Sequence, residues 1–470
     1  MKYLAPIRIA RSRVRLYSSA SLPSAPSTKY SETTCKFARL PETKEFIKNS
    51  SQYLLPVYAR PNLVLSHGKG SYVWDTEGNK FLDFSAGIAV NALGHADEGV
   101  TKVMTEQSSK LLHTSNVYHN EWAPILARLI ITLTQNEGGL GYTGHSAPET
   151  SAKVFFSNSG TEANEGALKI ARKVGKDRWT AETGIEWDAD PSKCTKTRIA
   201  CFEGSFHGRS MGSVSVTVNP KYQNPFTPLI PGVEVGKLND LDGISKIVTK
   251  DTCAVIVEPI QGEGGVNTAG VSWLRALRKR CNEVGAILIY DEIQCGLYRT
   301  GTLWAHSAYP ADCHPDIVTM AKPLANGYPI GAILVKEKIA VAMAAGSHGT
   351  TFGGSPLACA IGYHVLGRLA DPSFGVRMKE TSEYLSARLG LLPKWFPNIL
   401  EERVRGRGLI RGLGFKDGQH PGRIVELARE RGLLVLTAGK EVARLVPSLT
   451  VSKEEISVAA EILESSLGQL

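Results

Sequence analysis

The chain has no apolar run long enough to span a bilayer. Its apolar segments, such as AVIVEPI (254–260) and AILIY (286–290), stop well short of the roughly 18 to 20 residues that a membrane helix needs. With 42% hydrophobic and 21% charged residues, the composition is typical of a globular protein. We therefore expect no membrane partner, and the length of 470 residues predicts two or three folding units.

Several binding-site patterns are also missing. The eight cysteines form no C-x-x-C pair, which predicts no metal site, no disulfide framework, and thiols that are reduced and mostly buried. The glycine-rich turns lack the G-K-[ST] of a Walker loop and the G-x-G-x-x-G of a dinucleotide turn. No repeat of 20 to 50 residues is visible, so solenoids and propellers are excluded.

Acidic residues are absent from the first 31 positions. Six of the nine excess positive charges lie there, so the rest of the chain is nearly balanced and a nucleic-acid partner is not expected. A basic, serine-rich segment without a long apolar centre is typical of a mitochondrial transit peptide, and residues 1–31 predict an address in the mitochondrial matrix. A disordered basic tail is the alternative.

From about residue 153 onward, short apolar runs alternate with longer amphipathic ones. This order predicts an α/β fold with a mostly parallel sheet wrapped by helices. Residues 177–197 mix charges with Trp, Gly and Pro, and we expect an insertion or a long surface loop there. The predicted layout has a large domain (91–355) and a smaller α+β domain built from an N-terminal segment (32–90) and a C-terminal one (356–470).

Polar residues follow the ends of several predicted strands, and such ends converge on one crevice in an open α/β sheet. Ser159, Gly160 and Thr161 open a helix and predict a phosphate site, although simple helix capping by an S-x-x-E box explains them too. Asp291 and Glu292 end a buried strand, where an unpaired carboxylate is costly and a cationic ligand group would remove that cost.

The remaining strand ends offer a ring and two cations. Phe206 and Arg209 combine an aromatic platform with a fork-shaped cation suited to a carboxylate, and in isolation they could be an ordinary loop aromatic and a surface arginine. Lys322 follows another strand and, taken alone, could simply reach water along its apolar stem. A phosphate cradle, a carboxylate, a ring and a lysine together match pyridoxal 5'-phosphate, which needs all four.

Six motifs then indicate a family. SNSGTEANEGALKIAR, FHGR, EPIQGEGG, DEIQCGLYRTG, TMAKPLANGYPIGA and HGTTFGGSPLACA, in this order, resemble the class III aminotransferases of the fold-type I pyridoxal-phosphate family, from about residue 50 to the end. FHGR, SNSGTEANE and HTSNVYHNE are most similar to members that act on N2-acetylornithine. The resemblance implies transfer of its δ-amino group to 2-oxoglutarate, which gives N-acetylglutamate 5-semialdehyde and glutamate in arginine biosynthesis.

The same resemblance implies roles for cofactor residues. Lys322 would bind the cofactor and move the proton, and Asp291 would pair with the pyridine nitrogen. Gln294 would bind the ring oxygen, and Phe206 would stack on the ring. Ser159, Gly160 and Thr161 would hold the phosphate.

Five residues are implied for the substrate and the partner subunit. Thr351 matches a phosphate ligand from the neighbouring subunit, which implies a homodimer with shared active sites. Arg209 would bind the α-carboxylate of acetylornithine, and Thr350 would also contact the substrate. Glu263 would cover Arg444 for the ω-amine substrate and release it for glutamate.

Rival functions remain. Within the family, ornithine and 4-aminobutyrate aminotransferases are the nearest, although His207 stands where ornithine aminotransferases typically have tryptophan. Ser355 also departs from the asparagine that the family often has, and we expect a packing change there. An NAD-dependent dehydrogenase would use a parallel sheet, but it explains neither Lys322 nor Asp291.

Overall fold

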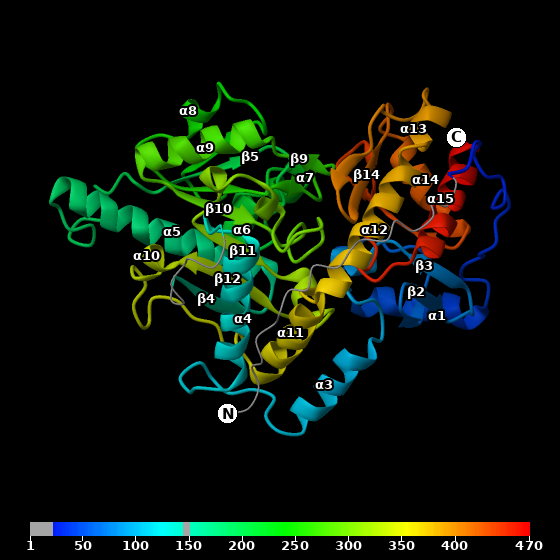
Figure 1. Ribbon diagram of the computed structural model, residues 1–470, viewed down its shortest axis with the longest axis horizontal. Helices are drawn as coiled ribbons and strands as arrows, with labels where there is room; N and C mark the ends of the chain where they lie inside the picture. Colours follow the sequence, from blue (N-terminus) through cyan, green and yellow to red (C-terminus); the bar gives the residue numbers. More distant parts are fainter. Residues whose placement is uncertain (1–21, 144–150) are drawn as a thin grey trace.

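A seven-stranded sheet lies at the centre of the computed structural model, which describes residues 22–143 and 151–470 (Figure 1). The strands follow in the order β4-β12-β11-β10-β7-β5-β6. Neighbours are parallel except where β12 runs antiparallel to β11 and β4, which confirms the predicted mostly parallel α/β sheet. The strands are β4 (Ala152–Ser157), β5 (Arg198–Phe202), β6 (Val233–Gly236), β7 (Thr252–Val257), β10 (Ile287–Asp291), β11 (Ile317–Met320) and β12 (Gly331–Lys336).

The central strands are buried because their side chains are apolar on both faces of the sheet. Every residue of β7, β10 and β11 is buried. One hydrophobic cluster joins α5 (Gly160–Thr183) to Ile289, and another joins α9 (Val271–Val284) to Leu288. Successive strand residues point to opposite faces, so the two helices cover opposite sides of the sheet. All eight cysteines are buried free thiols, as predicted.

The segment 177–197 is only partly a loop. Helix α5 continues to Thr183, and Gly184 ends it in the left-handed conformation with φ of 72°. The prediction was wrong for the first part of the segment because its charges belong to a helix surface. Asp177 accepts from Lys173 one turn earlier at 2.5 Å, and Trp179 is buried.

Two smaller sheets form a second unit, beside the large sheet in Figure 1. In one of them, a C-terminal strand pairs in parallel with an N-terminal strand through Leu433 and Leu82, so the two ends of the chain share one sheet. The domain boundaries at residues 90 and 355 stay a prediction. The strands are β1 (Leu65–Lys69), β2 (Tyr72–Asp75), β3 (Lys80–Asp83) and β15 (Leu433–Leu434), then β13 (Arg405–Arg407), β14 (Ile410–Gly414), β17 (Val442–Leu445) and β16 (Leu436–Ala438).

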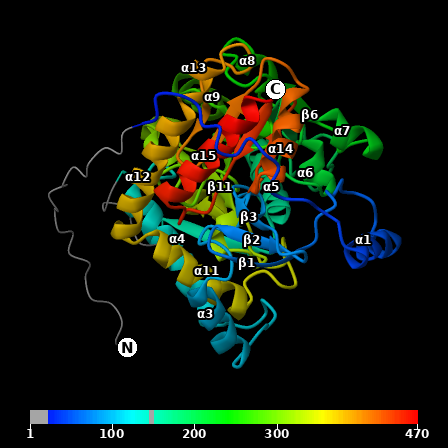
Figure 2. The same cartoon turned by 90° about the vertical axis from the view of Figure 1, so that its right-hand side faces the viewer.

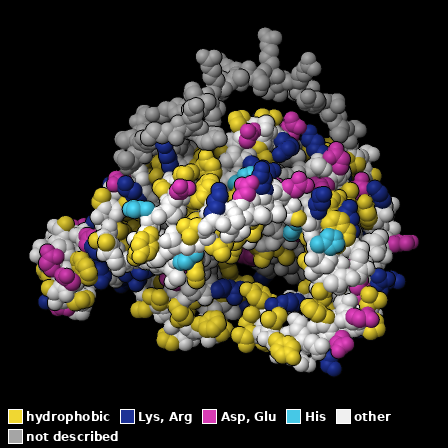
Figure 3. Space-filling model, turned by 90° about the horizontal axis from the view of Figure 1, so that it is seen from below, with side chains coloured by type: hydrophobic (Ala, Val, Ile, Leu, Met, Phe, Trp, Pro, Cys, Tyr) yellow, Lys and Arg dark blue, Asp and Glu magenta, His cyan; other side chains and the backbone are white. Residues whose placement is uncertain are grey.

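The remaining helices cover these sheets, and α11 lies between the two units (Figure 1). On the face shown in Figure 3, basic and acidic side chains are interspersed. Within residues 22–143 and 151–470, no helix combines the length and apolar character that a membrane crossing requires. The longer helices are α1 (Pro41–Tyr53), α3 (Glu98–Ser108), α4 (Trp122–Glu137), α11 (Pro356–Leu369), α12 (Pro372–Leu389), α14 (His420–Glu430) and α15 (Lys453–Leu467). The short elements are α2 (Ala86–Ala89), α6 (Met211–Ser215), α7 (Pro220–Gln223), α8 (Ile244–Ile247), α10 (Glu337–Ala340), α13 (Leu392–Trp395), β8 (Ile260–Gln261) and β9 (Asn267–Thr268), and the 3₁₀ turns η1 (Asn224–Phe226), η2 (Ala305–Ala308), η3 (Ala311–Cys313) and η4 (Lys322–Ala325).

The end of the predicted transit peptide contacts the C-terminal helices. Ser27 N donates to Glu464 Oε2 at 2.9 Å, and Arg431 Nε donates to the carbonyl oxygen of Tyr30 at 2.7 Å. Figure 2 shows this N-terminal segment beside α15. A boundary at residue 31 would therefore remove part of the folded body. Residues 1–21, most of the predicted peptide, lie outside the described residues.

Candidate active site

Residues that follow five parallel strands meet in one cavity of about 260 Å³. β4, β5, β7, β10 and β11 point the same way, so their C-terminal ends lie at one edge of the sheet, where α/β proteins bind ligands. The cavity brings together a large part of the predicted site. The predicted residues that line it are Ser159, Gly160, Thr161, Phe206, Arg209, Asp291, Gln294 and Lys322.

The start of α5 lines this cavity. Ser159 is the N-cap, and its Oγ accepts from Glu162 N at 3.3 Å. Glu162 does not complete a capping box, because its carboxylate accepts from Asn158 N at 2.8 Å. The N–H groups of a first helical turn have no acceptor within the helix, so those of Gly160 and Thr161 can bind a phosphate.

Asp291 is held by a buried polar network. Its Oδ2 accepts from Asn164 Nδ2 and from His207 Nδ1, each at 2.8 Å. Thr319 orients the Asn164 amide by donating to its Oδ1 at 2.7 Å. The Asp291 side chain is only 3% exposed, so these donors supply the hydrogen bonds that a buried carboxyl group needs in place of water.

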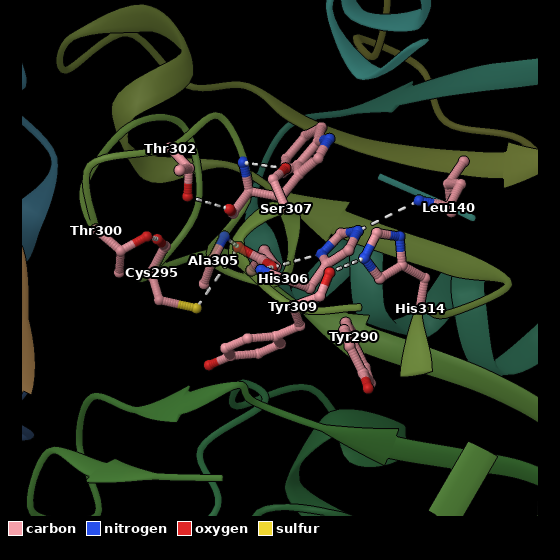
Figure 4. A network of polar contacts seen from close by, with 12 residues as sticks. Leu140, Tyr290, Cys295, Thr300, Thr302, Ala305, His306, Ser307, Tyr309 and His314 are labelled. Carbon is pink, nitrogen blue, oxygen red and sulfur yellow. Dashed lines mark hydrogen bonds and ion pairs between the residues drawn. The ribbon is translucent and has the colours of Figure 1, made fainter. Parts of the chain in front are cut away.

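Glu292 takes no part in the cavity. Its Oε2 accepts from Ala305 N at 2.6 Å, and its Oε1 accepts from His306 N at 3.0 Å and from His306 Nδ1 at 2.7 Å. Figure 4 shows this network, in which His306 lies beside His314. We expected both carboxylates to need a cationic ligand, and this is wrong for Glu292, because protein N–H groups satisfy it.

Lys322 begins η4 immediately after β11 and lines the same cavity as Asp291. Burial lowers the pKa of its ammonium group, and the positive charge of Arg444 lowers it further. The carboxylates of Glu263, Asp291 and Glu258 act in the opposite direction. A lysine with a lowered pKa has more of the neutral amine that can act as nucleophile or base.

Glu263 and Arg444 form the ion pair that the family resemblance implies. Arg444 is 1% exposed at its side chain, and its Nη2 donates to Glu263 Oε1 at 3.0 Å. Its Nη1 donates to the Gly262 carbonyl oxygen at 2.8 Å and to Gln294 Oε1 at 2.9 Å. Most of the donors of this guanidinium are therefore occupied by the protein.

Arg209 is exposed at the rim of the cavity. Its guanidinium carbon lies 3.8 Å from the ring centroid of Tyr222 and 5.6 Å from that of Phe206. Cations at such distances from a ring face are attracted by its π-electrons. In the part of the chain that the structure describes, no carboxylate lies within ion-pair distance of Arg209.

The two predicted threonines do not line the cavity of their own chain. Thr350 Oγ1 accepts from Asn158 Nδ2 at 3.0 Å, so Thr350 contacts the residue that precedes Ser159. Thr351 and Phe352 are exposed. The role of Thr350 in binding substrate and the role of Thr351 in binding the phosphate of the neighbouring subunit stay predictions.

Sequence reasoning missed Asn164 and Glu258, and it named His207 without its contact to Asp291. Asn164 and His207 hold Asp291, and Glu258, which directly follows β7, lines the cavity. Glu258 accepts from Phe206 N at 2.9 Å and from Gly262 N at 3.2 Å. Burial raises its pKa, while His207 opposes this rise. The signal was its position at a strand end in EPIQGEGG, which is the same signal that identified Asp291.

Residues 56–467 match the family model for class-III aminotransferases. The mitochondrial acetylornithine aminotransferase of Neurospora crassa is 49% identical over 90% of this chain and 87% of its own length. The protein of the same name from Yarrowia lipolytica is 46% identical over 92% of this chain and 98% of its own length.

Solved structures show the same fold. The N-acetylornithine aminotransferase of Stenotrophomonas maltophilia matches with a TM-score of 0.71 and 34% identity, over 90% of this chain and 98% of its own. The ornithine aminotransferase of Toxoplasma gondii matches with a TM-score of 0.77 and 31% identity, over 90% of this chain and 94% of its own. The latter structure is described as having partial occupancy of PLP at the active site.

Proposed function

The chain belongs to the class III aminotransferases, and from this we propose that it transfers the δ-amino group of N2-acetylornithine to 2-oxoglutarate with pyridoxal 5'-phosphate bound at Lys322. The products would be N-acetylglutamate 5-semialdehyde and glutamate, in arginine biosynthesis. The observation that supports this most is the meeting of Lys322, Asp291 and the first turn of α5 in one cavity.

The residues present suit the cofactor. The N-terminus of α5 offers N–H groups to a phosphate, and Asp291 offers a carboxylate to a protonated ring nitrogen. Phe206 offers a ring face between them. Gly208, with φ of +136°, allows its loop to approach Thr161, because a Cβ at this position would collide with the Thr161 side chain. When bound, pyridoxal phosphate supplies an aldehyde and an electron-accepting ring.

The side chains then divide the work. Lys322 Nζ would be the nucleophile toward the cofactor aldehyde, and it would then take the proton from the amine-bearing carbon of the substrate and pass it to C4′ of the cofactor, which its lowered pKa favours. Asn164 and His207 hold Asp291 in place by hydrogen bonds to its Oδ2, which orients the carboxyl group toward the ring nitrogen. Gln294 accepts from Arg444 through Oε1, which leaves its amide nitrogen to donate to the ring oxygen.

The substrate follows from the relatives and from the two arginines. Curated relatives between 41% and 49% identical over about nine-tenths of this chain or more are named acetylornithine aminotransferases. Arg209 binds the α-carboxylate of acetylornithine, which leaves the distal amine to react. Glutamate instead presents its α-amine, so its α-carboxylate needs Arg444, and Glu263 covers Arg444 until then.

Ornithine aminotransferase activity is the second candidate, because the Toxoplasma gondii structure matches this fold with a TM-score of 0.77. A panel of amino donors separates the two activities. We expect the purified holoenzyme to prefer N2-acetylornithine over ornithine and 4-aminobutyrate in kcat/KM. A preference for free ornithine would overturn the proposed substrate and leave the aminotransferase class intact.

Cofactor binding at Lys322 can be tested directly. Reduction of the holoenzyme with borohydride followed by peptide mapping should place the cofactor label on Lys322. The Lys322→Ala variant should bind the cofactor without covalent labelling and should lose activity. Label on another lysine would contradict the assignment, and any dependence on added NAD would favour a dehydrogenase.

A homodimer would explain the exposed apolar residues near the N-terminus. Tyr53, Leu55, Val57 and Tyr58 are 85%, 79%, 72% and 68% exposed. Tyr58 also lines a hollow of about 490 Å³. Patches of this kind mark interaction sites. A second copy of the chain carries the same apolar patch and could cover this one. The Thr351 of that copy would reach the cofactor phosphate bound by the first copy.

Subunit mixing tests the shared site. Lys322→Ala and Thr351→Asp should each be weakly active, because the first lacks the lysine and the second repels the phosphate. Mixed dimers should regain activity, since one of their two sites combines an intact Lys322 with an intact Thr351 from the partner. Mixtures as weak as the separate variants would place Thr351 in its own subunit's site or in none.

The relatives' names also support a mitochondrial address, and we assign the matrix as its place. Because residues 27–31 contact the C-terminal helices, the transit peptide should end before Ser27. Removal of residues 1–21 should abolish import and leave the melting temperature unchanged. Removal of residues 1–31 should also lower the melting temperature. If the two truncated proteins melt at the same temperature, the boundary at residue 31 would stand.

A further inference from the structure

Tyr222 forms a stack with Arg209 at the rim of the cavity. The guanidinium of Arg209 lies over the Tyr222 ring, 3.8 Å from its centroid. The rings of Phe206 and Tyr222 meet edge to face, with centroids 5.8 Å apart and planes at 81°. A continuous contact therefore runs from the ring that lines the cavity, through Tyr222, to the exposed arginine.

The element that presents Tyr222 is fixed to its surroundings. Tyr222 lies in α7, whose N-cap Asn219 accepts from Lys221 N at 3.0 Å. The neighbouring side chain, Gln223, donates through Nε2 to the Val214 carbonyl oxygen at 3.0 Å. These contacts hold the segment that carries the Tyr222 ring, while Arg209 is an exposed side chain.

The contact of Arg209 with the Tyr222 ring does not use the N–H donors of the guanidinium group. A carboxylate partner would restrict the guanidinium but would also use its N–H groups, whereas a ring face restricts it without accepting those N–H groups in the guanidinium plane. The five donors of the fork stay available for bidentate binding of a substrate carboxylate. Holding the fork in place beforehand reduces the conformational entropy that binding would cost.

We propose that Tyr222 is a positioning residue that sets affinity for carboxylated amino donors by holding Arg209 through its ring. This rests on the proposed function, in which Arg209 binds the donor's α-carboxylate. The ring is the acting group, so Tyr222→Phe should keep most of the affinity and Tyr222→Leu should lose it.

Two amino donors that differ only in the carboxylate provide the test. N2-acetylornithine and N-acetylputrescine share the acetamide and the distal amine, but only the first has an α-carboxylate. Rapid mixing of each donor with the holoenzyme gives a limiting rate and a half-saturating concentration for the first half-reaction. For acetylornithine, Tyr222→Leu should raise that concentration by about 2- to 30-fold, corresponding to ~0.5–2 kcal/mol at ~1.4 kcal/mol per tenfold, with little change in limiting rate.

The controls separate positioning from general damage. Phe226→Leu removes a ring that is 56% exposed in the same segment, and it should behave as wild type. N-acetylputrescine should show no difference between wild type and Tyr222→Leu. In an Arg209→Leu background, Tyr222→Leu should add no further loss, because its effect acts through Arg209.

Either of two results would overturn the proposal: unchanged affinity for acetylornithine in Tyr222→Leu, or an equal loss for both donors. Failure of the proposed function is distinguishable, because the wild-type enzyme itself would then not use acetylornithine. In that case the matched pair of ornithine and putrescine decides the role of Tyr222 in the same way.

Discussion

Arg209 lines the cavity, and Arg444 donates to Gln294, which lines it too. The protein holds these two arginines in opposite ways. Arg444 is 1% exposed and donates to Glu263, Gln294 and the Gly262 carbonyl oxygen. Arg209 is exposed and rests on the faces of Tyr222 and Phe206. The guanidinium group of Arg444 is thus occupied by hydrogen bonds, whereas that of Arg209 is available to a ligand. In the proposed reaction, the type of contact that holds each arginine would decide which of the two can bind a substrate carboxylate. Ring contacts leave Arg209 able to bind one, whereas hydrogen bonds to Arg444 must first be released.

The largest effect should come from removing the available arginine. In Arg209→Leu we expect kcat/KM for acetylornithine to fall roughly 10²- to 10⁴-fold, because each hydrogen bond to a charged group contributes about 1.5–3 kcal/mol and a fork makes two. Arg209→Lys keeps the charge and should lose less. Steady-state kinetics check this. A similar loss in Arg444→Leu for the acetylornithine half-reaction would remove the distinction between the two arginines.

A smaller effect should follow from uncovering the occupied arginine. In Glu263→Ala, Arg444 loses its carboxylate partner, which favours presentation of an α-amine. The preference between the acetylornithine and glutamate half-reactions should move by roughly 10- to 150-fold toward glutamate.

Rapid mixing with each donor measures the two half-reactions separately. Glu263→Gln, which keeps a hydrogen-bond acceptor without the charge, should fall between wild type and Glu263→Ala. An equal slowing of both half-reactions, or of neither, would mean that Glu263 only satisfies its own loop.

The smallest effect concerns Glu258, which connects the two arginine regions by accepting from Phe206 N and Gly262 N. Burial raises its pKa above the ordinary 4.5, so the folded protein binds this proton more tightly than the unfolded chain. Stability from this group is therefore lost as the pH rises from about 4.5 through the raised pKa, with a slope of at most ~1.4 kcal/mol per pH unit.

Urea unfolding of wild type and Glu258→Gln between pH 5 and 8 isolates that contribution, because other titrating groups are common to both proteins. The wild type should lose stability relative to the variant as the pH rises. Parallel curves would show that the Glu258 proton is bound equally in the folded and unfolded states.

Much of the fold could be predicted because it depends on local patterns. The doubly apolar runs of β7, β10 and β11 indicated buried parallel strands, and strand ends then located Asp291 and Lys322 near each other. The end of α5 was missed because its polar residues form a helix surface rather than a loop.

The residues that support the site could not be predicted in the same way. Asn164 meets Asp291 across 127 positions of the chain, and no local pattern marks such a pair. Glu292 looked like Asp291 in sequence, yet neighbouring positions on a strand point to opposite faces, and only one of them reaches the cavity. Tyr222 reads as an ordinary loop aromatic until its ring is seen beneath Arg209.

The pairing of the two chain ends also fixes an order of assembly. Ser27 and Glu464 meet across 437 positions, and β3, which pairs with β2 on one side, gains its second neighbour only when β15 is present. A chain that emerges from a ribosome or crosses a membrane from its N-terminus can fold the large sheet first, since the strands of that sheet all precede residue 337. The N-terminal segment must wait, with its apolar residues uncovered, until the last helix arrives. During that interval the earliest part of the chain is the one most in need of a chaperone.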